Sequence, residues 1–284
     1  MEKWDLYTKY KEKTNEEYIR QSECLIPEEK YHLVVHVWIR NSKGEYLISQ
    51  RAANRPTFPL SWECVGGSVL AGESSIEGAL RETKEEVGID LDLAKGKLVF
   101  SKIRNEYDGI KFRDIMDVWL FEYDGEIDLR NAAADEVADA KWMTKDEILN
   151  LHEAGKLVKT LDYFFCALEA PDKDYSNVIG KNVTGIIDRP LGSAHPRKST
   201  MIYPMNYGYV NGVIAGDGAE QDVYVFGTNE PLKTFSGKVI AVYRRFNDVE
   251  DKWIVSLDGS DISDNKILGE ISFQEQFSYG KLYR

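Results

Sequence analysis

The apolar residues of this chain recur with two different periods, and each period predicts a different kind of element. Residues 31–40 form a nearly continuous apolar run, YHLVVHVWIR, which predicts a strand. The turn residues NSKG separate it from a second predicted strand over residues 45–51. Residues 97–126 predict strands and a hairpin, and residues 134–170 predict a short strand that leads into helices. The first half of the chain therefore has the pattern of an α/β fold.

Apolar positions between residues 74 and 88 recur every three or four residues, which predicts a helix with one buried stripe. Ser74 and Glu77 form an S-x-x-E capping box at its start, and Gly88 ends it where a left-handed residue is favoured. The stripe comprises Ile76, Ala79, Leu80, Thr83 and Val87. Near the N-terminus Trp4, Tyr7 and Tyr10 share this helical spacing, and we interpret them as packing residues rather than ligand-binding residues.

A change of composition over residues 169–176 marks a predicted linker. The residues beyond it are rich in Gly, Tyr and Val, with turn signals between short strands, which predicts an all-β region. The chain has 284 residues, enough for two domains of ordinary size. We therefore predict a mixed α/β domain over residues 1–170 and a small all-β domain over residues 171–284.

Composition narrows the class of protein and the kind of partner. Apolar residues make up 43% and charged residues 30%, as in a soluble globular protein, and the net charge of -12 argues against a nucleic-acid polymer as partner. The three cysteines, Cys24, Cys64 and Cys166, are too few and too scattered for a disulfide or zinc framework. No apolar run approaches a membrane span and the N-terminus has no hydrophobic signal core, so we expect a cytoplasmic location. The oligomeric state is left open, with a homodimer as one alternative.

The polar face of the predicted helix carries three acids. Glu82, Glu85 and Glu86 are spaced three and four residues apart, so their like charges crowd one face. A divalent cation would remove that repulsion, because Mg²⁺ and Mn²⁺ take oxygen ligands and bridge to phosphates. Arg81 lies one turn from both Glu77 and Glu85 and can hold the face in place. The alternative is a solvated acidic face, which is what most charge runs are.

The full string containing these acids resembles the signature of the Nudix hydrolases, G-x5-E-x7-R-E-U-x-E-E-x-G-U. Its positions are filled by Gly67, Glu73, Arg81, Glu82, Glu85, Glu86, Gly88 and Ile89. Thr83 stands where that family usually has an aliphatic residue, and we interpret it as a packing variant. The resemblance implies an α/β/α sandwich. It also implies that water cleaves a diphosphate linked to another group X with the help of Mg²⁺ or Mn²⁺.

The resemblance also implies roles for individual residues. Glu82 and Glu86 would be the principal metal ligands, with Glu85 as a third and a backbone carbonyl near Gly66 as a further ligand. Gly67, Glu73, Arg81 and Gly88 would be structural. The general base is left open between acids of the helix, Glu82 and Glu85, and acids outside it, Glu136 and Asp114.

Two further pairs of residues flank this site in the sequence. Arg51 and Arg55 border the loop that enters the signature, and guanidinium groups match phosphate geometry, so they are candidate substrate contacts. Solvated loop arginines are the alternative. His32 and His36 would face the same side of a strand, which suits either a metal pair or, since no third ligand is in sight, packing on the sheet.

Parts of the first half also resemble the Nudix branch that includes isopentenyl-diphosphate isomerases. Gly66 and Ser68 stand where those isomerases have a catalytic Cys and a His, and Cys64 is two residues out of register. The isomerases also lack the full R-E-x-x-E-E run. Hydrolysis of a nucleoside diphosphate-X or a related small molecule is therefore our interpretation. An isomerase and a non-catalytic nucleotide- or phosphate-binding sensor are the alternatives.

The second half resembles the soluble, metal-dependent inorganic pyrophosphatases, through the strings Y-P-x-N-Y-G-Y and D-G-x-x-x-D. The resemblance implies a small β-barrel and two sets of ligand residues. Phosphate contacts would be Arg189, Tyr203 and Tyr207, and metal ligands would be Asp217, Asp222, Asp248 and Asp251. Ala219 replaces an aspartate that the family uses to generate the nucleophile. An active pyrophosphatase, a degenerate phosphate-binding barrel and a structural or dimerising module are therefore all open.

Overall fold

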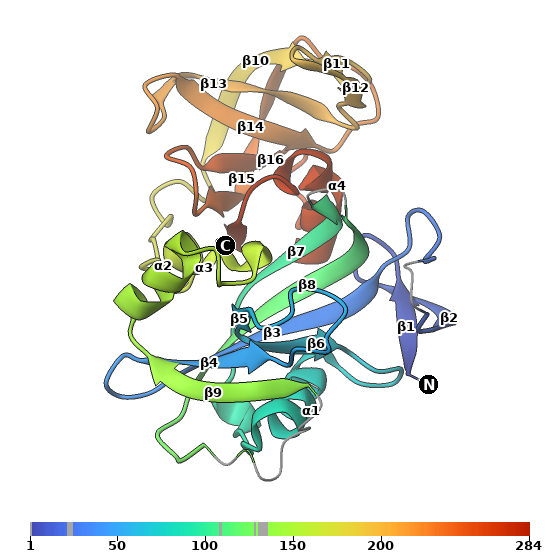
Figure 1. The fold of residues 1–284 in the computed structure, drawn as a ribbon. Coiled ribbons are helices and arrows are strands. Elements are labelled where there is room, and N and C mark those ends of the chain that lie inside the picture. Colours follow the sequence, from blue (N-terminus) through green and yellow to red (C-terminus); the bar gives the residue numbers. More distant parts are fainter. Residues whose placement is uncertain (1, 22–24, 108–109, 128, 130–135) are drawn as a thin grey trace. The chain divides into compact units, whose positions relative to one another are not determined.

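The computed structural model describes residues 2–21, 25–107, 110–127, 129 and 136–284 (Figure 1). The chain divides into two compact units. One comprises Met1–Thr8 and Glu12–Leu168, and the other comprises Lys9–Lys11 and Glu169–Arg284. Cys24, one of the three cysteines of the sequence analysis, lies outside the described residues. None of the described helices combines the length and the apolar character that a membrane-spanning helix needs.

The first unit is built on a seven-stranded mixed sheet in the order β5-β4-β3-β8-β7, with β6 paired to β3 and β9 paired to β4. Its strands are β3 (His32–Arg40), β4 (Tyr46–Arg51), β5 (Trp62–Glu63), β6 (Val65–Ser68), β7 (Lys97–Tyr107), β8 (Ile110–Glu122) and β9 (Val137–Met143). The central pair, β3 and β8, is parallel, whereas β7 and β8 form an antiparallel hairpin. The predicted strands of the first half are therefore confirmed.

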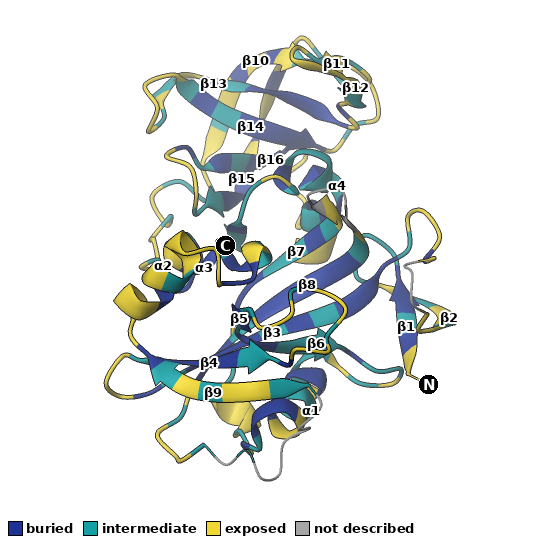
Figure 2. Cartoon of the chain, in the orientation of Figure 1, coloured by how far each residue is buried: buried dark blue, intermediate teal, exposed yellow. Residues whose placement is uncertain are grey.

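Helices cover this sheet on two sides. They are α1 (Ser75–Val87), α2 (Lys145–Glu153) and α3 (Phe164–Ala167), with the 3-10 turns η1 (Leu93–Lys95) and η3 (Lys159–Leu161). Alternate residues of β3 face opposite ways: Val35 and Val37 pack in one core with Ala79 and Val87 of α1, whereas Trp38 packs on Phe164 of α3 at 4.5 Å between ring centroids. Figure 2 shows that β3 and β8 are mostly buried, while α2 buries only Ile148. The α/β/α sandwich is confirmed.

Helix α1 begins and ends where its sequence predicts. The hydroxyl of Ser74 accepts a hydrogen bond from the backbone N–H of Glu77, whose carboxylate accepts one from the backbone N–H of Ser74. Gly88 ends the helix at a φ of 70°. Thr83 is fully buried and its hydroxyl donates to the carbonyl of Ala79 at 2.8 Å, which is a packing position as predicted.

The helical spacing near the N-terminus was misleading. Trp4 and Tyr7 lie in strand β1 (Lys3–Tyr7), which pairs with the antiparallel strand β2 (Lys13–Ile19), and Tyr10 lies in the segment that connects the two strands. Trp4 pairs with Tyr18 across the hairpin, and Tyr7 exchanges two backbone hydrogen bonds with Tyr31 at 2.7 and 2.9 Å. Lys11, with a φ of 58°, lies in the connecting turn. Long-range strand pairing, which spacing alone does not reveal, decides the structure here.

The second unit is a closed five-stranded barrel in the order β10-β13-β14-β16-β15, closed because β10 pairs with both β13 and β15. The strands of this unit are β10 (Asn182–Arg189), β11 (Ala194–His195), β12 (Lys198–Ile202), β13 (Asn206–Ile214), β14 (Glu220–Phe226), β15 (Thr234–Arg245), β16 (Lys252–Ser256) and β17 (Gly280–Tyr283). The barrel prediction is confirmed.

The prediction of an all-β second half omitted one helix, α4 (Asp264–Glu275). Ser263 caps its N-terminus by accepting from the backbone N–H of Lys266. Ile267 and Ile271, one turn apart, are fully buried in the same core as Tyr203 and Tyr224 of the barrel. Its apolar stripe is short, and packing against the barrel stabilises it more than local propensity does.

Candidate functional site

The acidic face of α1 approaches strand β6 closely, and Gly67 makes this approach possible. A Cβ atom on Gly67 would lie 2.3 Å from the carboxylate carbon of Glu82. A Cβ on the neighbouring Gly66 would lie 2.7 Å from the carbonyl oxygen of Val35 in β3. A larger residue in place of Gly66 would therefore push the strand away from β3, whereas one in place of Gly67 would displace the carboxylate of Glu82. This gives Gly67, predicted as structural, a steric reason to be glycine.

Arg81 is the centre of the hydrogen-bond network on this face. Its guanidinium donates to both carboxylate oxygens of Glu73 at 2.8 and 3.1 Å and to the carbonyl of Ser68 at 2.9 Å. It also donates to Glu82 at 2.9 Å and to Glu85 at 3.0 Å. Glu77, which the spacing also places one turn away, caps the helix instead. Arg81 thus joins the loop before α1 to the acids on it.

Glu86 is the acid that Arg81 does not reach. Only 7% of Glu86 is exposed, and its carboxylate accepts a hydrogen bond from the backbone N–H of Gly66 at 3.4 Å. Burial, together with the charges of Glu63 and Glu82, raises the pKa of Glu86 well above its ordinary value. Among the described residues no lysine, arginine or histidine forms an ion pair with it. A buried carboxylate without a counter-ion is unusual, because the charged form is costly to desolvate.

Two further acids share this environment. Burial raises the pKa of Glu82 to about 7 in spite of Arg81, and it also raises the pKa of Glu63, which Arg51 partly offsets. Sequence reasoning missed Glu63, the one acid in the apolar stretch SWECV, although an acid in such a stretch is itself a signal. Glu85, by contrast, has a side chain that is 56% exposed.

The oxygen atoms on this face fit the ligand preference of a divalent cation. The face offers buried carboxylates and backbone carbonyls, and it has fewer protein cations than carboxylates. The predicted trio is nevertheless not gathered around one point: Glu82 and Glu85 contact Arg81, whereas Glu86 lies at Gly66. Within the described part of the chain, no three acidic, histidine or cysteine side chains are grouped closely enough to share an ion. Binding a cation therefore requires the carboxylates to turn towards one another.

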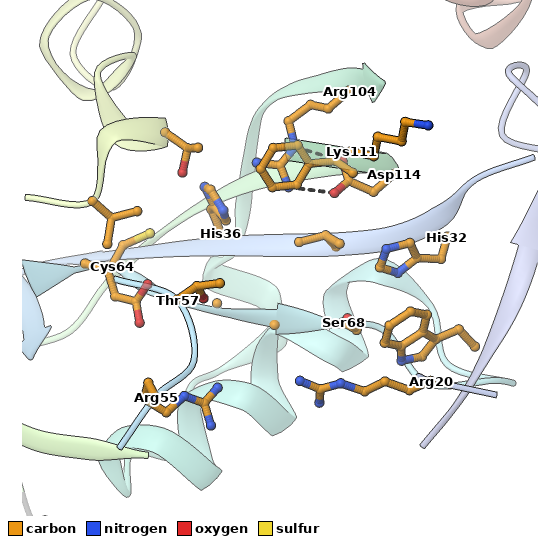
Figure 3. Close-up of a pocket in the computed structure, with 18 of the residues that line it drawn as sticks. Arg20, His32, His36, Arg55, Thr57, Cys64, Ser68, Arg104, Lys111 and Asp114 are labelled. Carbon is orange, nitrogen blue, oxygen red and sulfur yellow. Dashed lines mark hydrogen bonds and ion pairs between the residues drawn. The ribbon is translucent and has the colours of Figure 1, made fainter. Parts of the chain in front are cut away.

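A cavity of about 460 Å³ borders this face and includes Gly66, Gly67 and Ser68 in its wall (Figure 3). Both predicted substrate arginines line it. Arg51 is held by Glu63 at 2.5 Å, and Arg55 pairs with Glu136 at 3.1 Å. The cavity is of the size that small-molecule ligands occupy.

The candidate bases outside the helix lie in different settings. Glu136 is 39% exposed in its side chain and reaches the cavity through its ion pair with Arg55. Asp114 lines the cavity but is 2% exposed and accepts two hydrogen bonds from Arg104, at 2.8 and 2.7 Å. Both oxygens of this carboxylate are engaged by Arg104, so Asp114 is the weaker candidate.

His32 and His36 both line the same cavity, as expected from their shared face of β3. Nδ1 of His36 is hydrogen-bonded to the hydroxyl of Tyr163 at 2.8 Å, and His32 stacks on Trp4. Burial lowers the pKa of His32 to about 4 and that of His36 to about 3, so both rings are neutral near pH 7. These contacts favour the packing interpretation of the pair over a metal site.

The barrel has a cavity of its own, also about 460 Å³, which brings four of the predicted residues together. These are Arg189, Tyr203, Tyr207 and Asp222. Sequence reasoning missed Lys252, whose ammonium group lies 2.5 Å from Asp222 and also bonds Glu250. Its side chain is only 3% exposed, so a protein cation is built in among these carboxylates.

The other predicted metal ligands of the barrel do not line this cavity. Asp217 accepts from the backbone N–H of Ala219 within a turn, and Asp248 pairs with Arg245 at 3.0 Å. Asp251 accepts from Lys173 at 2.7 Å and from the hydroxyl of Tyr175 at 2.5 Å. The four aspartates are thus divided among separate partners, because Ala219 and the intervening ion pairs leave no common centre.

Known proteins resemble this chain mainly in its first unit. The NUDIX domain model matches residues 30–164. An uncharacterized Nudix hydrolase of Listeria monocytogenes is 37% identical over 166 residues, which are 58% of this chain and 91% of that protein. A nucleoside triphosphatase, NudI, of an Enterobacter species is 29% identical over 133 residues, which are 43% of this chain and 90% of that protein.

More distant relatives include an isopentenyl-diphosphate Delta-isomerase of Shigella boydii, 24% identical over 121 residues, which are 42% of this chain and 65% of that protein. Among solved structures, a Deinococcus radiodurans protein superposes with a TM-score of 0.45 at 24% identity, covering 56% of this chain and 93% of its own. The domain model ends before the barrel, which begins at Asn182.

Proposed function

Because this chain belongs to the Nudix hydrolases, which act on phosphoanhydride bonds, we propose that it hydrolyses the diphosphate linkage of a small molecule at the cavity beside α1. The observation that carries the proposal is Glu86, a buried carboxylate with no protein counter-ion among the described residues, next to the backbone of Gly66 in the cavity wall. Charged phosphate substrates and buried acids are brought together most readily through a shared divalent cation.

In this proposal Glu82, Glu86 and the backbone at Gly66 hold Mg²⁺ or Mn²⁺, and Glu85 contributes directly or through water. The ion, when bound, supplies Lewis acidity and lowers the pKa of a bound water. Arg81 keeps Glu82 on the strand side of α1 through its bonds to Glu73 and Ser68. Arg81 therefore orients the ligand helix, and Glu73 fixes Arg81.

The substrate phosphates are bound by arginines at the cavity in this proposal. Arg55 is the stronger candidate, because its partner Glu136 is exposed and the pair can open. Arg51 is more firmly held, through Glu63 and the carbonyl of Thr57 at 2.9 Å, so it shapes the wall. Glu85 and Glu136 remain the candidate bases, since both carboxylates reach solvent.

The test is release of phosphate or diphosphate from a panel of nucleoside and prenyl diphosphates with Mg²⁺. Wild-type protein should turn over at least one member, and Glu86→Gln should abolish this. Glu153→Gln, at an exposed position of α2, is the matched control and should keep full activity. If the wild type hydrolyses no member and Glu86→Gln leaves metal-dependent ligand binding intact, the hydrolase proposal is wrong and the sensor alternative stands.

For the barrel we propose phosphate binding without hydrolysis. Arg189 and Lys252 line the barrel cavity, but Asp217, Asp248 and Asp251 lie elsewhere, and Ala219 stands where the resemblance to pyrophosphatases implies an acid. Calorimetry of the full chain with inorganic phosphate and diphosphate tests this, with Arg189→Ala as the variant that should weaken binding. Hydrolysis of inorganic diphosphate by the Glu86→Gln chain at the rate of the wild type would instead indicate an active barrel.

A further inference from the structure

The cavity of the barrel contains hydrogen-bond donors that no protein group engages. His195 lines this cavity, and its Nδ1 atom accepts a hydrogen bond from the backbone N–H of Arg197 at 3.1 Å. An imidazole nitrogen that accepts a hydrogen bond carries no proton, so the proton of the neutral ring is on Nε2, which can only donate. Within the described part of the chain this Nε2 atom has no acceptor, and the protein does not enclose it. His195 therefore has an unused N–H at the cavity.

Two further groups of the cavity wall are also unused. The hydroxyl of Tyr209 and the Nη2 atom of Arg189 have no hydrogen-bond partner among the residues that the structure describes, and both atoms remain accessible. Nη1 of Arg189 donates to Asp188 at 2.5 Å, and its Nε is enclosed, so neither of these is a ligand contact. The guanidinium lies 5.6 Å from the centre of the Tyr207 ring. A guanidinium only donates and a phenol hydroxyl can donate, so the free groups suit a ligand rich in acceptors.

The carboxylates of this cavity have partners of their own, with one exception. Asp222 accepts hydrogen bonds from the hydroxyl of Tyr207 and from Nζ of Lys252, the latter at 2.5 Å. Glu220 accepts from the backbone N–H of Gly212 at 3.2 Å. Of the lining carboxylates that the structure describes, Glu220 alone has no cationic partner. Its charge opposes an anionic ligand, which makes it useful as a test.

The residues of this cavity do not fit a metal ion. Mg²⁺ needs several oxygen ligands around one point. Here the ammonium group of Lys252 takes that place, because it bonds both Asp222 and Glu250 and its side chain is only 3% exposed. The ammonium group also offsets negative charge that would otherwise repel a phosphate. The cavity therefore contains the positive charge that a phosphate site needs without an added ion.

The hairpin that carries His195 is held in position by the barrel. Strands β11 and β12 pair with each other, and among the described strands with no other (Figure 1). At the base of the hairpin the N–H of Gly192 donates to the carbonyl of Tyr203 at 2.8 Å, and the N–H of Tyr203 donates to the carbonyl of Ser193 at 2.9 Å. The ring of His195 stacks on Tyr203 at 6.1 Å between centroids, with 6° between the planes. A ligand would thus meet a preformed donor.

We propose that the barrel cavity binds a phosphate group, free or esterified, without a metal ion. In this proposal His195, Tyr209 and Arg189 donate hydrogen bonds to the phosphate oxygens, and Lys252 takes the place of the ions that pyrophosphatases use. The cavity of about 460 Å³ is larger than one phosphate group, so an ester fits as well. The inference rests on the proposed phosphate binding of the barrel, and it adds the independence from metal and the role of the β11–β12 hairpin.

The test is calorimetric titration of the full chain with inorganic phosphate and with glycerol 3-phosphate, first in EDTA and then with Mg²⁺. The two probes distinguish a free phosphate from an ester. The Glu86→Gln chain serves as the parent, so that an ion at the cavity of the first unit does not contribute. At least one probe should bind in EDTA, with an affinity within about threefold of its affinity in Mg²⁺.

Variants of the cavity wall assign this binding to the barrel. His195→Phe keeps a stacked ring and removes the N–H, and Tyr209→Phe removes the hydroxyl. Each should weaken binding in EDTA by about tenfold, as expected for a hydrogen bond to a charged group. Glu220→Gln should strengthen binding, because it removes an opposing charge. His152→Phe, at an exposed position of α2, is the matched control and should have no effect.

Thermal unfolding verifies that each variant is folded, and if His195→Phe is not, Tyr209→Phe decides. The proposal is overturned if the probes bind only with Mg²⁺, or if the folded His195→Phe and Tyr209→Phe chains both keep the parent affinity. It is also overturned if the folded Glu220→Gln chain binds more weakly, as a site for a cationic ligand would.

The dependence on metal separates this inference from the proposed function of the barrel. Binding that requires Mg²⁺ and is lost in Arg189→Ala would leave phosphate binding by the barrel standing and would overturn only its independence from metal. Absence of binding by both probes under both conditions would overturn the two together.

Discussion

The two cavities of this protein differ in how the negative charge of their buried carboxylates is compensated. In the barrel, the ammonium group of Lys252 lies between the carboxylates of Asp222 and Glu250. Beside α1, Arg81 engages Glu82 and Glu85, but Glu86 is buried without a protein cation among the described residues. Acids that carry their own counter-ion have little need of a metal, whereas an uncompensated buried acid gains from one. This difference supports the proposal of a metal ion at the first cavity and gives no such support at the second.

The largest expected effect comes from removing the uncompensated acid. Glu86→Gln should lower kcat for the metal-dependent reaction by about a thousandfold, since the contribution of a bound ion is several kcal/mol. Without metal the same variant should unfold at a higher temperature than wild type, because a buried charge has been removed. Phosphate-release kinetics and thermal unfolding with and without Mg²⁺ measure both. Unchanged kcat would remove the contrast between the cavities.

The reciprocal change in the barrel should act on stability. Lys252→Met leaves Asp222 and Glu250 without their cation and should lower the free energy of unfolding by about 3 kcal/mol, the usual cost of breaking a buried ion pair. Millimolar Mg²⁺ should restore part of this loss in the variant only. Lys238→Met, at an exposed position of β15, is the control and should be nearly neutral. Urea unfolding measures all three, and an equal response of the two variants would contradict the prediction.

Acid should destabilise the first unit through its buried histidines. Burial lowers the pKa of His32 from 6.5 to about 4. Between these pH values the unfolded chain binds a proton at His32 and the folded chain does not. This contribution to stability is complete above pH 6.5 and is lost as the pH falls towards 4, with a total on the order of 3 kcal/mol. Urea unfolding of wild type and His32→Phe between pH 7.5 and 4.5 should show a shallower pH slope in the variant. Parallel slopes would contradict the prediction.

The smallest expected effect compares the two helix caps. Ser74 has both hydrogen bonds of a capping box, whereas Ser263 has only its side-chain bond to Lys266. Ser74→Ala should therefore cost about 1 kcal/mol and Ser263→Ala about half as much. Chemical unfolding of the two variants provides the measurement, and a larger loss at Ser263 would reverse the ranking.

The parts that were predictable from the sequence are those with local causes. The bounds of α1 follow from Ser74, Glu77 and Gly88, which are close in the chain and act on the same helix. The N-terminal hairpin was mistaken for a helical stripe because its strands depend on Trp4 pairing with Tyr18 and on Tyr7 bonding to Tyr31. Such long-range pairings leave no periodic trace in so short a segment.

The sequence predicts which acids belong to the candidate site, but it does not predict the ion pairs that these acids form. The signature names Glu82, Glu85 and Glu86, yet which of them Arg81 engages depends on the distance between α1 and β6. Glu63 and Lys252 belong to their sites through tertiary contacts alone, and neither is part of a motif. Ion-pair partners are set by the packed structure, because many arrangements of the same charges are compatible with one sequence.

Gly67 carries a consequence for how this protein can change over evolutionary time. A single added carbon there would fall 2.3 Å from a carboxylate of the facing helix. A side chain at this position would therefore displace the Glu82 carboxylate from its contact with Arg81, without requiring the helix to move. Replacement of this glycine would reorient a predicted metal ligand and leave the fold in place, so it would affect the site before it affects the strand.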